Sequence, residues 1–522
     1  MYTIVNLSAA IIQVSIYERI TTAMCSGANE NINEVKLDKK LSPINVWAIA
    51  FGCIIGSGAF LLPGTSFLPK AGPLGAAAAM LTGAFAMVII AINYNFMINK
   101  YPVAGGELTY AKEAFGNIHS FICAWFLSLS YLMIVPFNAT ALSMVARSFF
   151  GSVFQVGFHY NAAGYDIYCG EIILGIFALV FFALLNIRGV KFTGMFQTVL
   201  SCLLVSAVII IFTAAVLKGV LNVENLSPLL AENDVLADAA SKTTGALARH
   251  GRSGLSGVLK VLAVAPFCFL GFDTTSQAAE ELKFSVKKSK IIMVLSIFFG
   301  AFIYIALNLA AASCRPDGYA DWTEYIADVN AGALSGIENI PTFNAARTLL
   351  GTPGLIFIGI AVLAAICSGI TGFYLATSRI MYRMSKAKII PPWFGMLHPK
   401  YKTPAKTLLF ILAISVIAPF FGRTALGWIV DMTSLGAAIG FGYTSAAAFK
   451  FARKDGNRSI AVTGFLGTAM SCVFALLLLV PVPMLDCALG RESLICLALW
   501  IVMGIVFYVY ENFCHRGKFM IK

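Results

Sequence analysis

The sequence predicts an all-α polytopic membrane protein with twelve transmembrane helices, and three observations support this fold class. The chain has 522 residues, of which 59% are apolar and only 12% are charged, whereas soluble domains carry about 25% charged residues. Long apolar runs recur along the chain, and basic residues gather between some of these runs but not others. So few charged residues cannot cover the water-exposed surface of a soluble multidomain enzyme. The 41 Phe and 18 Tyr exclude a disordered chain.

The predicted spans follow from length, because a helix that crosses a bilayer needs about 20 mostly apolar residues. Stretches of this kind lie at 43–68, 74–98, 118–149, 171–187, 194–217, 256–280, 290–313, 351–378, 405–421, 425–449, 459–480 and 492–511. They divide the chain into the segments 1–42 (N-terminal tail), 43–220 (five spans), 221–255 (outer loop), 256–450 (five spans) and 451–522 (two spans and a C-terminal tail).

The charge distribution predicts the orientation of the spans. The chain carries 37 Lys and Arg and a net charge of +12. Most basic residues fall in short loops on one side, with the largest cluster between Arg379 and Lys406, while the loop before the eighth span is acidic. Since cytoplasmic loops collect Lys and Arg, we expect a multi-pass plasma-membrane protein with both termini in the cytoplasm. The positive charge then needs no nucleic acid as partner; lipid and a small-molecule substrate are the expected partners.

The first 40 residues give two open interpretations. Residues 4–16 are apolar but too short to span a membrane, and no basic segment precedes them as in a signal peptide. The segment is either a helix lying in the membrane interface or a product of a start codon assigned too far upstream. In the second case residues 1–23 are absent and Met24 is the start.

The 12 cysteines predict neither a disulfide framework nor a metal site. None belongs to a Cys-x-x-Cys pair, and most lie inside apolar runs, as Cys53 and Cys268 do. Buried free thiols are the expected state of such residues. No metal and no cofactor is therefore predicted.

The first span is interrupted around Ser57 by Gly52, Gly56 and Gly58. A glycine costs about 1 kcal/mol in a helix interior and allows the backbone to unwind. Unwound backbone within a membrane is tolerated only where it lines a cavity or binds something. The spacing of Gly52 and Gly56 also fits close packing against another helix, so packing alone is an alternative at this point.

The sixth span contains Gly271, Asp273 and three hydroxyl residues, Thr274, Thr275 and Ser276, within an otherwise apolar run. An ionisable side chain at this depth is costly unless it faces a partner or water, so Asp273 is a candidate functional residue. Asp273 can equally cap the N-terminus of a half-helix, and the two roles are compatible.

The two interruptions lie five spans apart, in corresponding positions of the two five-span segments. Paired interrupted spans are the best sequence indication of a transporter's binding site, and a five-span repeat is necessarily inverted because five is odd. A third feature, Gly105-Gly106 after Pro102 between the second and third spans, predicts at least a turn.

Four motifs together resemble the amino acid–polyamine–organocation (APC) permeases. The sequence Gly-x-Ile-Ile-Gly-Ser-Gly-x-Phe at 52–60 resembles their first signature, and Pro-x-x-Gly-Gly-x-x-x-Tyr at 102–110 is similar to their second. Residues 271–281 resemble the family's sixth span, and 378–404 resemble its loop after the eighth. The motifs occur in order across roughly 43–450.

The resemblance implies a LeuT-type five-plus-five inverted repeat with two further helices, and secondary transport of an amino acid or a related amine. It also implies where substrate binds, which agrees with the attraction of carboxylates to helix N-termini and of ammonium groups to freed carbonyls. The substrate-binding residues that it implies are Ile55, Gly56, Ser57, Gly58, Phe267, Phe269, Gly271, Phe272 and Asp273.

Ion coupling is where this chain departs from the family pattern. Proton-coupled members carry a lysine within the fifth span, and the matching position here is near Leu204. Ser368 and Thr371 in the eighth span are candidate hydroxyl ligands for a sodium ion, although such residues commonly hydrogen-bond neighbouring helices. The coupling ion, proton or sodium, is left open.

The sequence therefore predicts a permease that works by alternating access, and not an enzyme. All five histidines lie outside the interiors of the predicted spans, and no metal-binding set is present for catalysis inside the membrane. A polyamine or ethanolamine transporter, an amino acid exchanger and a transporter-like nutrient sensor are the alternatives. Tyr131, Asn138 and Tyr443 are candidates for further walls of the substrate pocket. The substrate and the oligomeric state are not predicted.

Overall fold

The computed structural model describes residues 41–103, 105–162, 165–189, 193–231, 254–482 and 487–519. The interpretations of residues 1–23 and 4–16, and most of the predicted outer loop at 232–253, lie outside this part of the chain. Within it the fold is helical apart from one two-stranded hairpin, which confirms the predicted all-α class.

The helices are grouped by the predicted segments, and the division into two five-span repeats stays a prediction. The first five-span segment contains α2 (Pro43–Ile54), α3 (Gly58–Leu62), a π-helical turn (Pro63–Phe67), α4 (Leu68–Lys100), α5 (Gly106–Phe115), α6 (Asn117–Phe150), α7 (Cys169–Arg188) and α8 (Thr193–Leu217). The second contains α11 (Gly254–Ala263), α12 (Ala265–Phe269), α13 (Thr274–Gln277), α14 (Ser289–Ser313), α15 (Trp322–Ala331), α16 (Pro341–Lys386), α17 (Ala405–Ser415) and α18 (Arg423–Lys454). The short helix α9 (Val223–Leu226) lies between them, and α19 (Arg458–Leu479) and α20 (Arg491–Phe519) follow.

Nine helical stretches among the described residues are long and apolar enough to cross a membrane. One of them, Pro43–Lys100, covers the first two predicted spans, which are separated at Gly72 by a non-helical φ of +71° with Pro73 next. The sixth predicted span consists of shorter helices, and the ninth is the short helical stretch Ala405–Phe421. The count of twelve stays a prediction.

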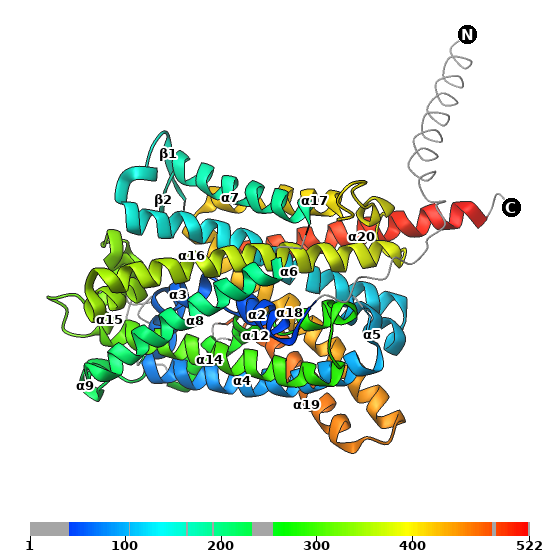
Figure 1. Cartoon of the computed structure of the whole chain (residues 1–522), viewed down its shortest axis with the longest axis horizontal. Coiled ribbons are helices and arrows are strands. Elements are labelled where there is room, and N and C mark those ends of the chain that lie inside the picture. Colours follow the sequence, from blue (N-terminus) through cyan, green and yellow to red (C-terminus); the bar gives the residue numbers. More distant parts are fainter. Residues whose placement is uncertain are drawn as a thin grey trace, which may run out of the picture.

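The long helices run side by side along one axis (Figure 1). Helix α5 lies at one end of this bundle, called here the α5 end, and α15 lies at the other, called the α15 end. Helix α6 crosses the interior and packs against α16 and α18. Large apolar side chains such as Phe177, Leu217 and Leu499 are exposed on the outside, as expected of a surface that faces lipid.

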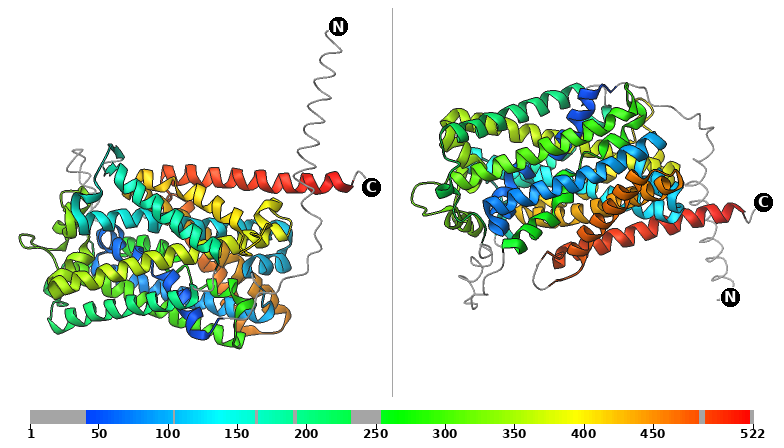
Figure 2. Two further views of the ribbon diagram at one scale, coloured as in Figure 1. Left: turned by 45° about the horizontal axis from the view of Figure 1, so that its top comes forward. Right: turned by 90° about the horizontal axis from the view of Figure 1, so that it is seen from below.

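Helix α20 lies along the outside of the bundle in both views of Figure 2. It is attached to α6 by two tryptophans, Trp125 and Trp500, whose rings stack with their centroids 4.4 Å apart. Each indole N–H donates to the backbone carbonyl of the other residue, at 3.0 Å and 3.2 Å. The pair thus gives both buried N–H groups an acceptor.

Two local features differ from the simplest interpretation of the sequence. The segment after Gly105 forms a ten-residue helix, α5, because Glu107 to Ala114 are mostly good helix formers. At the α15 end, β1 (His159–Ala162) and β2 (Tyr165–Tyr168) pair antiparallel and form a small hairpin that the span pattern did not predict.

Candidate functional site

The first span is broken where the glycines predict. Helix α2 ends at Ile54, the next residue has non-helical angles (φ −97°, ψ 85°), and α3 begins at Gly58. Carbonyls near the break find side-chain donors on other helices. The Ser368 hydroxyl donates to Gly52 O at 2.9 Å, and the Tyr304 hydroxyl donates to Ile54 O at 3.3 Å. Helices α16 and α14 therefore replace part of the lost helical hydrogen bonding.

The sixth span is broken between α12 and α13, around Gly271. The Asp273 carboxyl group connects this break to α6. Its Oδ1 accepts from Gly271 N–H at 2.8 Å, and its Oδ2 accepts from the Tyr131 hydroxyl on α6 at 2.6 Å. Asp273 is fully buried. Both oxygens thus have partners within the protein, which favours the structural role that the sequence left open.

The two breaks touch one another through their backbones. Gly271 has φ +138°, and a Cβ placed on it would lie 2.7 Å from Ile54 N and 2.7 Å from Cys53 Cβ. Only glycine combines this conformation with so close an approach. The structure therefore brings Gly271, in the break of the sixth span, into direct contact with Cys53 and Ile54, the last residues of α2 before the break in the first span.

Asn138 on α6 lies beside the break in span one. Its Oδ1 accepts from Ser57 N–H at 3.1 Å and from the Ser57 hydroxyl at 2.9 Å. A Cβ on Gly56 would lie 3.3 Å from the same oxygen. Among the described residues no acceptor is found for Gly56 N–H. Gly58 N–H likewise has no backbone acceptor within the described part of the chain, and the start of a helix favours negative charge.

Two aromatic rings lie next to the start of α3. A Cβ on Gly58 would be 3.2 Å from the Phe267 ring, and this ring packs edge-to-face with Phe137 at a centroid distance of 5.2 Å. Phe267, Gly58 and Ser57 are all buried. In this conformation the aromatic pair closes over the break.

Two of the predicted site residues direct their side chains elsewhere. The Phe269 ring packs against Tyr304 on α14 at 6.4 Å. The Phe272 ring packs against Tyr94 at 5.4 Å and Phe441 at 5.3 Å. These two residues can therefore present only backbone groups to a ligand at the break.

The three candidate wall residues separate into two places. Tyr131 and Asn138 contact the breaks directly through Asp273 and Ser57, as described above. The Tyr443 hydroxyl lies 3.1 Å from His119 Nδ1 on α6, and its ring lies near Phe115 in α5. Tyr443 is thus at the α5 end of the bundle, away from the breaks.

The candidate ion-coupling residues lie where α8 and α16 meet α2. Ser368 accepts a hydrogen bond from Gln197 Nε2 while it donates to Gly52 O. The Thr371 hydroxyl is buried and has no hydrogen-bond partner among the described residues. Leu204 is buried and apolar, and α8 contributes two uncharged polar side chains here, Gln197 and Ser201, whose hydroxyl donates to Ala48 O at 3.0 Å. Within the described part of the chain, no three His, Cys, Asp or Glu side chains form a metal-binding group.

A second polar cluster, which sequence reasoning missed, joins α5 to the sixth span. Glu107 is fully buried, accepts from the Ser276 hydroxyl at 2.8 Å and also accepts from Gln277 Nε2. Nearby, Arg383 on α16 pairs with Glu280 at 3.0 Å. The signal in the sequence was an acidic residue placed directly after Gly105-Gly106. These bonds hold the α5 end of the break closed.

A third cluster ties the α15 end together. Asn330 at the end of α15 donates to Gly64 O at 3.0 Å, within the outer part of span one. Arg423 at the start of α18 donates to Asn330 Oδ1 at 2.9 Å and to Val329 O at 3.2 Å. Both ends of the bundle are thus cross-linked by side chains in the same conformation.

Glu107 predicts a pH dependence of stability. Burial, followed by the negative charge of Asp273, raises the pKa of the Glu107 carboxyl above its ordinary value. The closed state therefore binds this proton more tightly than the unfolded state does, so the stabilisation is complete at low pH and is lost as the pH rises through the raised pKa. We expect Glu107→Gln, which is always neutral, to flatten the decrease in Tm as the pH rises above about 4.3.

The measurement is the Tm of the purified protein across this pH range. Glu113→Gln is the matched control, because Glu113 is exposed on the same helix. An unchanged pH profile in Glu107→Gln contradicts the assignment.

Comparison with known proteins gives a consistent set of relatives. A family model described as "Amino acid permease" matches residues 41–507. The chain is 25% identical to the methylthioribose transporter of Bacillus subtilis (strain 168), over 77% of this chain and 79% of the relative. It is 23% identical to the branched-chain amino acid permease BcaP of the same organism, over 91% and 93%. It is 26% identical to the low-affinity putrescine importer PlaP of Escherichia coli (strain K12), over 70% and 70%.

Proposed function

Because this chain belongs to the amino acid permease family of the APC superfamily, a family of multi-pass membrane transporters, we propose that it is a secondary active transporter of an amino acid or a related organic amine. The contact between the two helix breaks carries the proposal, since it gathers unwound backbone, a helix N-terminus and an aromatic cover at one buried place. We propose the plasma membrane as its location, with both termini in the cytoplasm, from the basic loops at the α5 end.

The amino acid carboxylate would bind at the start of α3, where Gly56 N–H lacks an acceptor among the described residues. The amino group would bind carbonyls of the two breaks, and Phe267 would cover the side chain. Asp273 gives no support to a cationic substrate, because both of its oxygens already accept hydrogen bonds from protein groups.

Alternating access would use the two cross-linked ends. Substrate would leave toward the α5 end after the Glu107 and Arg383 contacts separate, and would enter from the α15 end after the Asn330 and Arg423 contacts separate. Bound substrate can bias this equilibrium only by stabilising one conformation more than the other. A substrate that binds groups of both broken spans at once would stabilise the conformation in which the two breaks are in contact.

The substrate is best identified by a thermal-shift screen of the purified protein against amino acids, amines and methylthioribose. The relatives' names span a thioribose, branched-chain amino acids and putrescine, so the screen covers all three classes. Stabilisation grows with the ratio of ligand concentration to Kd, so modest binders are detected. Uptake of the hits into liposomes, with imposed proton or sodium gradients, then distinguishes symport from exchange.

Gly58→Leu tests the site. A leucine side chain cannot fit beside Phe267, because even a Cβ at this position lies 3.2 Å from the ring. We expect uptake to fall to background while the amount of protein in the membrane stays the same. Gly58→Ala, which adds only that Cβ, should reduce uptake less. Undiminished uptake by Gly58→Leu would falsify the proposed site.

A further inference from the structure

Glu107 is a fully buried carboxyl group that the proposed substrate site does not use. Its oxygens accept from two uncharged donors, the Ser276 hydroxyl and the Gln277 amide. No ion pair joins Glu107 to Arg379, to Arg383 or to another Lys or Arg in the described part of the chain. A buried carboxylate without a positive charge beside it is costly, and such a group takes up a proton instead.

The groups around Glu107 do not supply the missing positive charge. The titratable side chains close enough to interact with its charge are Tyr94 on α4, Tyr110 on α5, Cys123 and Tyr131 on α6, and Asp273 at the break. None of these is a cation. On α16, Arg383 is paired with Glu280, and on α18, Lys450 donates to Ala114 O at the far end of α5. Burial, followed by the negative charge of Asp273, accordingly raises the pKa of Glu107.

Both hydrogen-bond partners of Glu107 can serve a protonated carboxyl group as well as an ionised one. A serine hydroxyl either donates or accepts, and a side-chain amide offers its N–H groups or its oxygen. Gln277 Oε1 is buried and has no hydrogen-bond partner within the described residues, so an acceptor is present on the same side chain. Asp273 differs, because its Oδ1 is held by Gly271 N–H, a backbone group that can only donate. Glu107 is therefore the carboxyl group whose surroundings tolerate a change of protonation.

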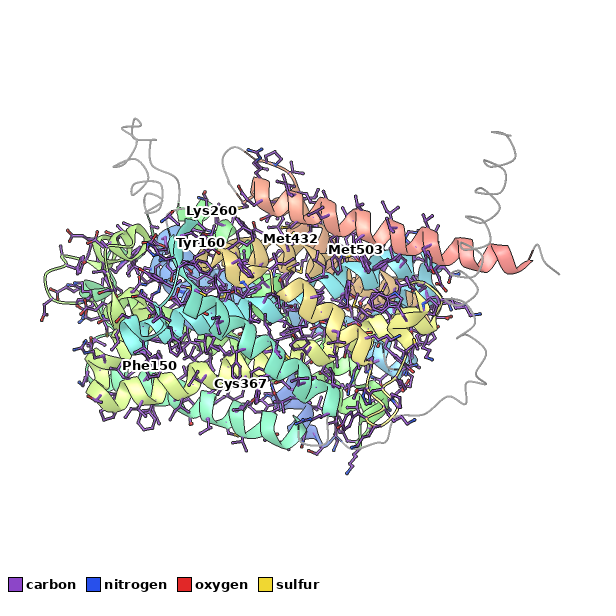
Figure 3. The ribbon with its side chains drawn as sticks, turned by 90° about the horizontal axis from the view of Figure 1, so that it is seen from above. Phe150, Tyr160, Lys260, Cys367, Met432 and Met503 are labelled. Carbon is purple, nitrogen blue, oxygen red and sulfur yellow. The ribbon has the colours of Figure 1, made fainter. Side chains whose placement is uncertain are left out.

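Glu107 lies between the break in the sixth span and the α5 end. Its partner Ser276 is three residues after Asp273, and Ser276 N–H donates to Asp273 O at 2.8 Å, so a single helical turn separates Glu107's partner from the break. Helix α6, which packs beside this turn, also packs against α16 and α18. Figure 3 allows these two helices to be located by their labelled side chains, Cys367 on α16 and Met432 on α18.

We propose that Glu107 is the proton-binding residue that couples transport by this chain to a proton gradient. The carboxylate would take up one proton and become a carboxylic acid while the α5 end is closed. Opening of the α5 end would separate Glu107 from Ser276 and Gln277 and admit water. Water favours the charged form, so the proton would leave to the solution at that end.

One proton would thus cross the membrane with each substrate molecule. The polar side chains that α8 contributes beside the first break, Gln197 and Ser201, do not titrate near neutral pH and offer no alternative proton site. The coupling rests on the proposed function, whereas the protonation of Glu107 does not. The two parts are therefore tested separately.

Infrared spectroscopy tests the proton on Glu107 without any substrate. The full chain in nanodiscs is titrated with acid and base, and the C=O stretching band of protonated carboxyl groups is recorded. We expect a band that declines as the pH rises through the raised pKa, that is missing in Glu107→Gln and that is retained in Glu113→Gln, a change at an exposed position of the same helix. An identical band in Glu107→Gln overturns the proposal.

Liposome transport tests the coupling. Radiolabelled leucine, glutamate, lysine and putrescine are used separately as probes, for exchange at equal pH and for uptake with the outside acidic. For a probe that the wild-type protein exchanges, we expect the pH gradient to raise uptake several-fold. Glu107→Gln should lose this stimulation while exchange persists, because exchange needs only the loaded protonated form, which glutamine imitates. Glu107→Asp keeps a titratable group and should keep part of the stimulation, and Glu113→Gln should keep all of it.

The outcomes separate the coupling from the transport function. Equal stimulation in Glu107→Gln and the wild-type protein overturns the proposal, and so does a wild-type protein that exchanges a probe but ignores the pH gradient. Loss of exchange together with stimulation in Glu107→Gln assigns the residue a structural role and also overturns it. Absence of wild-type exchange for every probe counts against the proposed function instead, and the infrared band then decides on the proton site alone.

Discussion

Gly271→Ala is expected to abolish uptake and to lower the Tm more than any other single methyl addition proposed for this protein. The new Cβ would lie 2.7 Å from Ile54 N and Cys53 Cβ, a distance that real Cβ atoms do not adopt. The residue would also hold φ +138°, which costs roughly 1–3 kcal/mol for a residue other than glycine. Backbone on both sides of the contact must therefore move, and the two breaks must separate.

Gly318→Ala separates the two causes. Gly318 also has a positive φ, +100°, but nothing lies within 4 Å of its added Cβ. Gly318→Ala should therefore lose only the stability that the unfavourable backbone conformation costs, and it should retain uptake. Measurements of Tm and liposome uptake on both variants check the prediction, and equal losses in the two would rule out the backbone contact as the cause.

Asp273→Ala is expected to be the most damaging change of a polar side chain. It leaves the Tyr131 hydroxyl and Gly271 N–H without their acceptor in a fully buried place. Each unpaired group costs about 1–3 kcal/mol, so the total loss is roughly 2–6 kcal/mol of stability. Uptake should fall to background, because the break in the sixth span loses the side chain that closes it.

Two further variants show which contact matters. Asp273→Asn retains one acceptor oxygen and can satisfy only one of the two donors, so its loss of Tm should be intermediate. Tyr131→Phe removes one of the two donors and should also be intermediate. In the Asp273→Ala background, adding Tyr131→Phe should cost little more, since the partner is already gone. Additive losses of Tm would show that the two side chains act independently.

The position of the helix breaks was predictable from the sequence, because glycine in an apolar helix and a carboxyl group within a membrane are both costly and therefore informative. The contact between the breaks was predictable only as a pairing of the first and sixth spans. Which backbone atoms approach at Gly271 depends on the crossing of two helices, and no local pattern records that. The same limit explains why α5 and the hairpin β1–β2 were not foreseen, since neither has the length of a span.

The candidate site was predictable at the level of backbone and less so for side chains. The pattern named Phe269 and Phe272 beside Phe267, but consecutive residues near a break point in different directions, and only Phe267 faces Gly58. Glu107 and Gln197 were missed because their partners, Ser276 and Ser368, are more than a hundred residues away. Long-range hydrogen bonds of this kind become visible only in the folded chain.

The indole pair between α6 and α20 gives the protein an optical reporter of its own. Two of only six tryptophans lie stacked at 4.4 Å, close enough for their electronic transitions to couple. Circular dichroism therefore contains a contribution from this contact, and the difference spectrum against Trp500→Phe separates it from those of the other aromatic residues. Detachment of the last helix by detergent or lipid should then remove this difference signal while the rest of the bundle stays folded.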